Sequence, residues 1–435
     1  MAMLVTADWV VPISRPPIRD GAVLIEHGVI AQIGRLCDFG SLAETVPTRV
    51  DLPGCTVMPG LVNAHTHLSL TAMEGLLEPA DFEVWLPRLV SAMRAWEPGD
   101  YAASATLGAR RCLEAGVTVV GDIVYGPEGA AVAADAGLGG TFYWELLGLK
   151  APQLYAELER LEFPAGAEGA CGTRVRCGLS PHSAYTSGPG FLRAVHAAAE
   201  ELSLPVAIHV AESRAEFDLL MHGTGPLADV AARLAPDFEV PGMTPVCYLD
   251  RLGVMDGATA VHLCHVSPTD ISRLSATIRG AVTCPRSNAF LGNAHPPIGR
   301  LLAHALPVGV GTDSAASNHD LDLMSEVRAI HEIDPSIPTS TLLQMATLMG
   351  AVALGVEDRF GVLETGMQGD LAAFRLGETI EPEADLVKRA GRDTLAAVCT
   401  AGKWRVREGE LVAGPDIDSS AEKARARAAE ALKSS

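Results

Sequence analysis

The middle of the chain alternates short apolar runs with longer stretches of helical character, and this alternation limits the folds that are open to it. Apolar runs end near positions 64, 120, 145, 180, 210, 264, 284 and 311. Helical stretches fill the gaps, for instance at residues 102–115, 191–202 and 268–279. A (β/α)8 barrel usually takes about 250 residues and accepts insertions. We therefore predict an α/β fold, with a (β/α)8 TIM barrel over residues 58–364 as the catalytic domain.

A doubly wound open sheet is the competing arrangement for alternating strands and helices. Its dinucleotide-binding form carries a Gly-x-Gly-x-x-Gly turn after the first strand. No such turn follows the run that ends near residue 64, so the barrel is favoured. In a barrel, functional residues sit at the C-terminal ends of the strands.

The two ends of the chain predict a second, smaller unit made of strands. Residues 22–25 and 29–33 flank a short turn, which is typical of a β-hairpin. Strand-like runs return after residue 363, so we predict that residues 1–57 and 365–415 form one small β-sandwich domain. Residues 416–435 are rich in Ala, Glu, Lys and Arg, which predicts an exposed helix or a disordered tail.

Charge and cysteine content exclude several classes of protein. The net charge is −20, from 33 basic and 53 acidic residues, whereas nucleic-acid binding needs concentrated Lys and Arg. The nine cysteines include no Cys-x-x-Cys pair, which indicates reduced thiols rather than a disulfide framework. No signal-like segment and no apolar run long enough to span a bilayer is present. We expect a cytoplasmic protein with neither a nucleic-acid nor a membrane partner.

Two histidines, His65 and His67, follow the first apolar run of the barrel region. Alternate residues of a strand share a face, so both imidazoles point the same way and suit one metal ion. In a chain with 13 histidines such a pair arises by chance about 0.4 times. The pair alone does not distinguish a metal site from two packed histidines, so the other strand ends must decide.

Four further strand ends carry unusual polar residues, namely His182, His209 with Glu212, His262, and Asp313. A catalytic divalent ion takes about four ligands and leaves a position for water. We predict that His65, His67, His209 and Asp313 hold such an ion, which lowers the pKa of its water toward about 7.

Glu212 lies three residues beyond His209 and suits proton transfer to the substrate. His262 can stabilise developing charge, and Asp313 can also take the proton of the attacking water. The alternative for His209 and Glu212 is a surface ion pair. Asp122 either supports a ligand or caps a helix, and His265 is expected to face away from the site.

Taken together, these residues resemble the amidohydrolase superfamily. The resemblance rests on four motifs: Pro59-Gly60-x-x-Asn63-x-His65-x-His67, His209-x-x-Glu212, His262, and Gly311-Thr312-Asp313-Ser314. It covers nearly the whole chain and implies one zinc or iron ion on His65, His67, His209 and Asp313. It also implies that Glu212 and His262 are catalytic and that His182 contacts the substrate.

Lysine is scarce, and this favours a single metal ion. Hydantoinase-like amidohydrolases bridge two metals with a carboxylated lysine after the fourth strand, where this chain has His182. No lysine occurs from 151 to 387, and Lys150 is the only near candidate. We predict one divalent ion, with zinc favoured and iron as the alternative. The cytidine-deaminase zinc site is excluded because its Pro-Cys-x-x-Cys motif is absent.

Within the superfamily, residues 209–213, 284–288 and 311–318 resemble the branch of cytosine, guanine and S-adenosylhomocysteine deaminases and triazine chlorohydrolases. Residues 121–128 and 181–186 are most similar to 6-amino-6-deoxyfutalosine deaminases of menaquinone synthesis, whose substrate is an adenine nucleoside bearing a benzoate. The anionic benzoate of such a substrate is bound best by cationic or hydroxyl groups of the protein. The predicted substrate-binding residues are His182, Tyr185, Arg286, Ser287 and Arg88. For Arg286, a structural salt bridge is the alternative.

The function predicted from these residues is metal-dependent hydrolytic deamination of an aminated purine nucleoside, with aminodeoxyfutalosine favoured. The alternatives are an adenosine, S-adenosylhomocysteine or guanine-type deaminase, or a chlorohydrolase or amidase that uses the same site. A non-enzymatic assembly protein of this fold is disfavoured because no predicted ligand is missing. Both a monomer and a homo-oligomer remain open.

Overall fold

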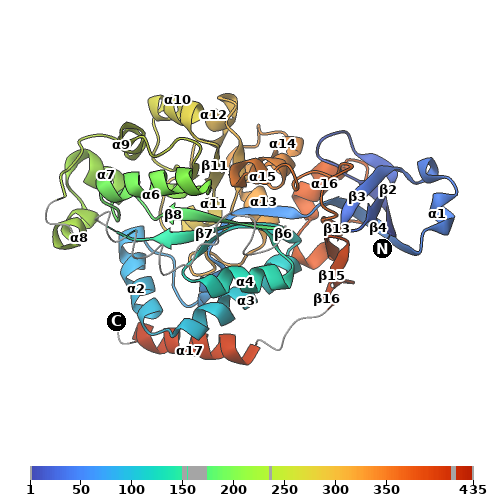
Figure 1. Cartoon of the computed structure of the whole chain (residues 1–435), viewed down its shortest axis with the longest axis horizontal. Coiled ribbons are helices and arrows are strands. Elements are labelled where there is room, and N and C mark those ends of the chain that lie inside the picture. The colour runs from blue at the N-terminus through green and yellow to red at the C-terminus, as the bar shows by residue number, and fades with distance from the viewer. Residues whose placement is uncertain (1, 149–153, 155–173, 235–237, 413–417, 434–435) are drawn as a thin grey trace.

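The computed structural model describes residues 2–148, 154, 174–234, 238–412 and 418–433. Parallel strands occupy the centre, helices lie around them, and a sheet built from both ends of the chain lies at one side (Figure 1). None of the described helices is both long and apolar enough to cross a bilayer.

The central strands form two four-stranded parallel sheets that follow the order of the chain, β5-β6-β7-β8 and β9-β10-β11-β12. Isolated parallel bridges join their outer edges, from Thr66 to Asp313 and from Leu179 to Val206. Each strand therefore has a neighbour on both sides, which is the strand order of a (β/α)8 barrel. The strands are β5 Leu61–Thr66, β6 Val117–Val124, β7 Gly139–Leu146, β8 Val175–Pro181, β9 Ala207–Val210, β10 Thr259–His262, β11 Gly280–Thr283 and β12 Val308–Val310.

Glycine lets β12 approach β5 closely at the junction of the two sheets. A Cβ atom on Gly311 would lie 2.7 Å from the carbonyl oxygen of His65 and 2.8 Å from its Cβ. The Asn63 side chain donates to Thr312 Oγ1 at 2.8 Å and accepts from the Thr312 backbone N–H at 3.0 Å. These contacts fix the level at which His65 and Asp313 face each other.

Helices connect the strands, and many begin with proline, which is pre-organised for the first turn and has no N–H to leave unpaired. Those around the central strands are α2 Phe82–Arg94, α3 Pro98–Glu114, α4 Pro127–Ala136, α6 Pro189–Leu202, α7 Arg214–His222, α8 Pro226–Leu234, α9 Pro245–Leu252, α10 Pro268–Thr277, α11 Pro285–Phe290, α12 Ile298–Ala303, α13 Leu323–Ile333, α14 Thr339–Met345 and α15 Leu348–Leu354. A 3-10 helix, η2 Leu68–Met73, follows β5 directly.

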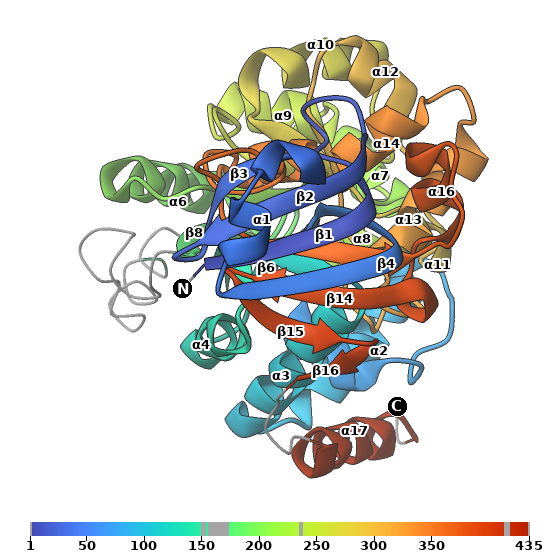
Figure 2. The ribbon, with the colours of Figure 1, turned by 90° about the vertical axis from the view of Figure 1, so that its right-hand side faces the viewer.

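Strands from both ends of the chain form one continuous hydrogen-bonded sheet of eight strands among the described residues, and its division into the two layers of a sandwich stays a prediction. Strand β4 pairs with β1 on one side and with β13 on the other, which joins the N-terminal and C-terminal strands edge to edge (Figure 2). Its strands are β1 Ala2–Val10, β2 Ile18–Glu26, β3 Val29–Arg35, β4 Thr48–Pro59, β13 Leu371–Arg375, β14 Leu395–Thr400, β15 Lys403–Arg407 and β16 Glu410–Leu411. Short helices complete this part: η1 Leu36–Phe39, α1 Leu42–Thr45, α16 Pro382–Arg389 and η3 Arg392–Thr394.

The tail contains a docked helix, α17 Asp418–Lys433, which lies against α2, α3 and η2 (Figure 1). Its alanine face is buried at Ala424 and Ala428. The indole N–H of Trp96 donates to the carbonyl of Ala424 at 2.7 Å, and Arg427 pairs with buried Asp100 at 2.6 Å. Of the two forms predicted for the tail, the described residues adopt the helix, but it is packed rather than free.

Candidate active site

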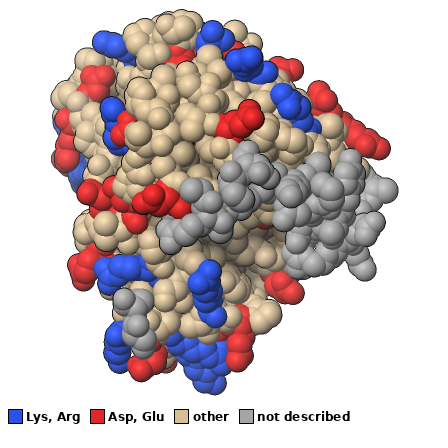
Figure 3. Space-filling view, turned by 90° about the vertical axis from the view of Figure 1, so that its left-hand side faces the viewer, with Lys and Arg blue, Asp and Glu red and all other residues tan. Residues whose placement is uncertain are grey.

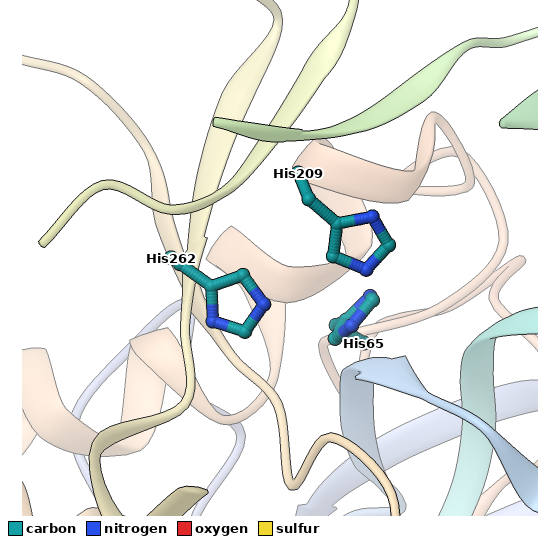
Figure 4. Close-up of side chains that lie close together, drawn as sticks. All are labelled: His65, His209 and His262. Carbon is teal, nitrogen blue, oxygen red and sulfur yellow. The ribbon is translucent and has the colours of Figure 1, made fainter. Parts of the chain in front are cut away.

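Histidines from three strands converge at one end of the central sheet. His65 lies on β5, His209 on β9 and His262 at the end of β10, and their rings turn toward one another (Figure 4). The ring centroids of His65 and His209 are 5.0 Å apart, and those of His209 and His262 are 5.5 Å apart. Nitrogen atoms of all three lie within 4.8 Å of one another.

Asp313 and His67 join this cluster. The Oδ1 atom of Asp313 lies 3.5 Å from His65 Nε2 and 3.4 Å from His67 Nε2. His65, His67 and Asp313 form a second group whose ligand atoms lie within 4.8 Å of one another, and it shares His65 with the first. The structure therefore brings together the four residues predicted to hold a metal.

Hydrogen bonds turn the Nε2 atoms of these histidines toward the centre. His209 Nδ1 donates to the carbonyl of His182 at 2.9 Å, and His67 Nδ1 lies 3.0 Å from the hydroxyl of Tyr125. A ring nitrogen bonded in this way leaves the other nitrogen free to bind a metal. His65 Nε2 is buried and has no hydrogen-bond partner among the described residues.

The protonation of the cluster also fits a cation. Burial lowers the pKa of His67 to about 3 and the pKa of His209 well below its usual value, so both imidazoles are neutral. Burial alone would raise the pKa of Asp313, but His65, His67 and His262 hold it well below the usual range. Neutral imidazoles and an ionised carboxylate are the donors that Zn²⁺ prefers.

The second oxygen of Asp313 is held by two hydroxyl groups. Ser287 donates to Asp313 Oδ2 at 2.6 Å and Ser317 donates to the same atom at 3.0 Å. Oδ1 is thereby left facing the histidines. Ser287 was predicted to bind substrate, but it is buried behind Asp313 and does not line the cavity.

Glu212 and His262 lie side by side next to the cluster. Glu212 Oε1 is 3.7 Å from His262 Nε2, while His262 Nδ1 donates to Asn288 Oδ1 at 2.9 Å. Burial raises the pKa of Glu212 to about 7. The backbone N–H of Glu212 donates to Glu216 Oε2 at 2.8 Å, which anchors the start of α7 below the site. Glu212 can therefore carry a proton near neutral pH.

Backbone strain gathers at these strand ends. Ala211, His262, Leu263 and Asp313 have φ angles of 53°, 75°, 56° and 56°. A non-glycine residue in this left-handed region costs about 1 kcal/mol or more and persists only where the surrounding structure enforces it. The strained backbone at His262 and Asp313 therefore lowers the stability of the folded chain, but it directs both side chains toward the cluster.

A cavity of about 690 Å³ opens from the cluster. His67, His209, His262, Glu212 and Asp313 line its inner end. One face of α2 lines another part of it, and we call this face the α2 wall: Phe82, Trp85, Leu86, Leu89, Val90 and Met93. On the side of the molecule toward which β7 and β8 run, acidic and basic side chains are interspersed over the visible surface (Figures 1 and 3).

The predicted substrate-binding residues divide into two sets. His182 and Tyr185 line the cavity. Arg286 does not, because its guanidinium pairs with Asp320 at 2.7 Å and lies 3.6 Å from buried Glu326, which is the salt bridge considered as the alternative. Arg88 is also absent from the lining of this cavity.

Besides the apolar α2 wall, sequence reasoning gave no role to the cavity residues Glu145, Tyr125 and Arg94. Glu145 stands near the end of β7, so the rule that located the histidines could have found it. Burial raises its pKa to about 8, and its Oε1 atom has no hydrogen-bond partner among the described residues. Arg94 lies in the last turn of α2, and no strand-end rule points to it.

The structure shows the surroundings of two other residues discussed from the sequence, Asp122 and His265, but does not describe the third, Lys150. Asp122 accepts a hydrogen bond from the backbone of Leu68 at 2.8 Å and so caps the start of η2. His265 is half-buried and absent from the cavity lining. Lys150 lies outside the described residues.

Comparison with known proteins places the chain in a family. A model of the amidohydrolase family matches residues 56–405. The chain belongs to the amidohydrolase family. The resemblance seen in its motifs is thereby confirmed, as is the prediction of a metal-dependent amidohydrolase.

The similar relatives and solved structures indicate the branch of the amidohydrolase family to which this chain is similar. The 5-methylthioadenosine/S-adenosylhomocysteine deaminase of Desulforudis audaxviator is 30% identical over 418 residues, which cover 92% of this chain and 93% of that protein. The crystal structure of a zinc-bound adenosine deaminase from Xanthomonas campestris matches with a TM-score of 0.84 and 27% identity, covering 98% of each chain. The aminofutalosine deaminase of Helicobacter pylori matches with a TM-score of 0.79, covering 93% of this chain and 100% of that one; at 21% identity, this likeness shows the fold alone.

Proposed function

We propose that this amidohydrolase is a hydrolytic deaminase of an adenine-type nucleoside, with 6-amino-6-deoxyfutalosine as the favoured substrate. One observation carries the proposal. Neutral imidazoles and an ionised carboxylate lie close together at the inner end of a cavity, and Glu212 lies beside His262 there. This arrangement suits the addition of water to a ring carbon and the departure of an amine.

His65, His67, His209 and Asp313 would hold one divalent ion, with zinc favoured, and when bound it would supply a water molecule activated near neutral pH. Asp313 can accept the proton that this water gives up. Glu212, which burial keeps protonated up to about pH 7, donates its proton to the ring nitrogen next to the aminated carbon. His262, fixed by Asn288, hydrogen-bonds the oxygen on which charge develops. The net reaction exchanges the amino group for oxygen and releases ammonia.

The choice of an adenine-type nucleoside rests on the relatives. The relative from Desulforudis audaxviator is named for two adenine nucleosides with 5′ thioether substituents, and the Xanthomonas campestris structure is named for adenosine. The motifs at residues 121–128 and 181–186 favour aminodeoxyfutalosine within this class. The second candidate is a methylthioadenosine or S-adenosylhomocysteine deaminase, and the apolar atoms of the α2 wall would also suit a thioether substituent.

The test is ammonia release from a panel of aminodeoxyfutalosine, adenosine, methylthioadenosine, S-adenosylhomocysteine and guanine, with the metal content of the enzyme measured in the same samples. We expect turnover of the adenine nucleosides, aminodeoxyfutalosine fastest, and none of guanine. Chelation should abolish turnover, and zinc should restore it. Absence of ammonia from every compound, with one ion bound per chain, would refute the proposal.

A further inference from the structure

The cavity is chemically divided. Three carboxyl groups line it, those of Glu145, Glu212 and Asp313, and all three belong to strand ends or the turns that follow them. Arg94 is the only Lys or Arg among the described residues that line the cavity. It is exposed, whereas Asp313 and Glu212 are buried, so the single cation lies toward the solvent and the acidic groups lie inside.

The α2 wall lies between the inner carboxyl groups and Arg94 in the lining of the cavity. Phe82, Trp85, Leu86, Leu89, Val90 and Met93 present apolar atoms to the cavity, and Arg94 follows them directly in the last turn. The helix is tied down near both ends. The indole N–H of Trp85 donates to the carbonyl of Ala316, in the loop after β12, at 3.2 Å, and Tyr101 donates to the carbonyl of Met93 at 3.2 Å.

Arg94 is available to a ligand. The described residues offer its guanidinium no side-chain hydrogen bond or ion pair, in contrast to Arg286, which already pairs with Asp320. An arginine in the last turn also stabilises its helix through the helix dipole. That role does not depend on whether the substrate carries a charge, which distinguishes it from recognition of a ligand in the cavity.

We infer that the α2 wall and Arg94 select the 5′ substituent of the nucleoside, favouring a substituent that is apolar along its length and carries an anion, such as a carboxylate, at its end. The inference rests on the proposed function, because the aminated ring must occupy the inner end for the substituent to reach α2. Arg94, the cation in the described lining, attracts the anionic end of the substituent toward the outer part of the cavity, which fixes the orientation of the substrate. Arg94 is thus a specificity-determining residue.

The experiment uses two matched substrates, 5′-(4-carboxybenzylthio)-5′-deoxyadenosine and its carboxamide, with adenosine as the reference. In the zinc-loaded wild-type enzyme, the carboxylate should have the lower KM. Arg94→Met should raise the KM of the carboxylate about 10-fold, the usual scale of a charge-assisted hydrogen bond near the surface. It should leave the carboxamide and adenosine within about 2-fold, and Arg94→Lys should keep most of the preference.

Arg88→Met is the matched comparison, because it removes a cation from the same helix at a position that does not line the cavity. Val90→Ser tests the wall and should raise the KM of both benzyl compounds alike but not that of adenosine. Melting temperatures identify any variant that fails through loss of the helix. An unchanged ratio of carboxylate to carboxamide in Arg94→Met, or the same change in Arg88→Met, would overturn the inference. Failure of the proposed function looks different, since wild-type enzyme would then deaminate none of the three compounds.

Discussion

The inner end of the cavity and the α2 wall are built in different ways. Four strand ends and the turns after them, at β5, β9, β10 and β12, supply the inner end, and the topology of the sheet brings them together wherever they lie in the sequence. The wall comes from one face of one helix. Which residues line it depends on how that helix is rotated against the strands. The first kind of site is visible in a sequence, whereas the second requires the packed structure.

The largest effect should come from removing the proposed proton carrier of the inner end, Glu212. Glu212→Gln keeps the shape and burial of the side chain but cannot transfer a proton, so kcat should fall about 10²- to 10⁴-fold. Metal content should be unchanged, because Glu212 is not among the described residues whose positions would allow them to hold a metal ion. Steady-state kinetics with elemental analysis tests this, and Glu200→Gln, a solvated acid on α6, provides the control. Near-normal turnover in Glu212→Gln would remove its proposed role.

The pH dependence of kcat/KM tests the same proposed role of Glu212. Burial raises the pKa of Glu212 to about 7, so the side chain holds its proton below that pH and loses it above. Because the proposed reaction needs the protonated form, kcat/KM should decline as pH rises through about 7. This alkaline limb should be missing from the residual activity of Glu212→Gln. A wild-type profile that rises steadily above pH 7 would contradict the acid role.

A smaller effect is expected from disturbing the junction that aligns the strand ends. In Gly311→Ala the new methyl group would meet the carbonyl of His65 at 2.7 Å, so β5 and β12 must separate. We expect about a 10²-fold loss of kcat/KM, because catalysis is sensitive to displacements of about 1 Å. The free energy of unfolding should fall by about 1–3 kcal/mol. Gly190→Ala, where the methyl group meets nothing within 4 Å, is the control for chemical denaturation and kinetics.

The smallest effect on activity is expected at Arg286, which the sequence had suggested as a substrate-binding residue. Arg286→Met leaves buried Glu326 without its neighbouring cation, which should cost about 2–3 kcal/mol of unfolding free energy. Adenosine and carboxylate-bearing nucleosides should be affected equally, because Arg286 does not line the cavity. A selective loss of the carboxylate substrates would return Arg286 to the binding site and weaken the assignment of Arg94.

Much of the barrel region followed from the sequence, because buried parallel strands appear as short apolar runs. The run predicted to end near Glu145 is β7 Gly139–Leu146, and the one near Ser180 is β8 Val175–Pro181. Spacing also located the residues that now cluster, since a strand end carries its histidine wherever the barrel order puts it. The supporting contacts were not predictable. Ser287 and Asp313 are far apart in the chain, and only packing shows that their side chains touch.

The terminal sheet was predicted less well than the barrel. Strand β14 Leu395–Thr400 was not foreseen, and its pairing with β13 and β15 extends the sheet that both ends of the chain form. Which distant strands pair depends on which strand edges are free to form hydrogen bonds in the folded chain. The sequence does not show this. The helix of the tail was foreseen as one alternative, but its docking was not. An alanine-rich face looks alike whether it meets solvent or another helix.

That docking links the far end of the chain to the choice of substrate. Helix α17 holds the segment just after α2 through Trp96 and Ala424, and α2 carries the wall of the cavity. Substitutions in α17 can therefore change which nucleosides are accepted without any change in the catalytic groups. The same linkage makes the N-terminus, beside the terminal sheet, the safer place for an affinity tag.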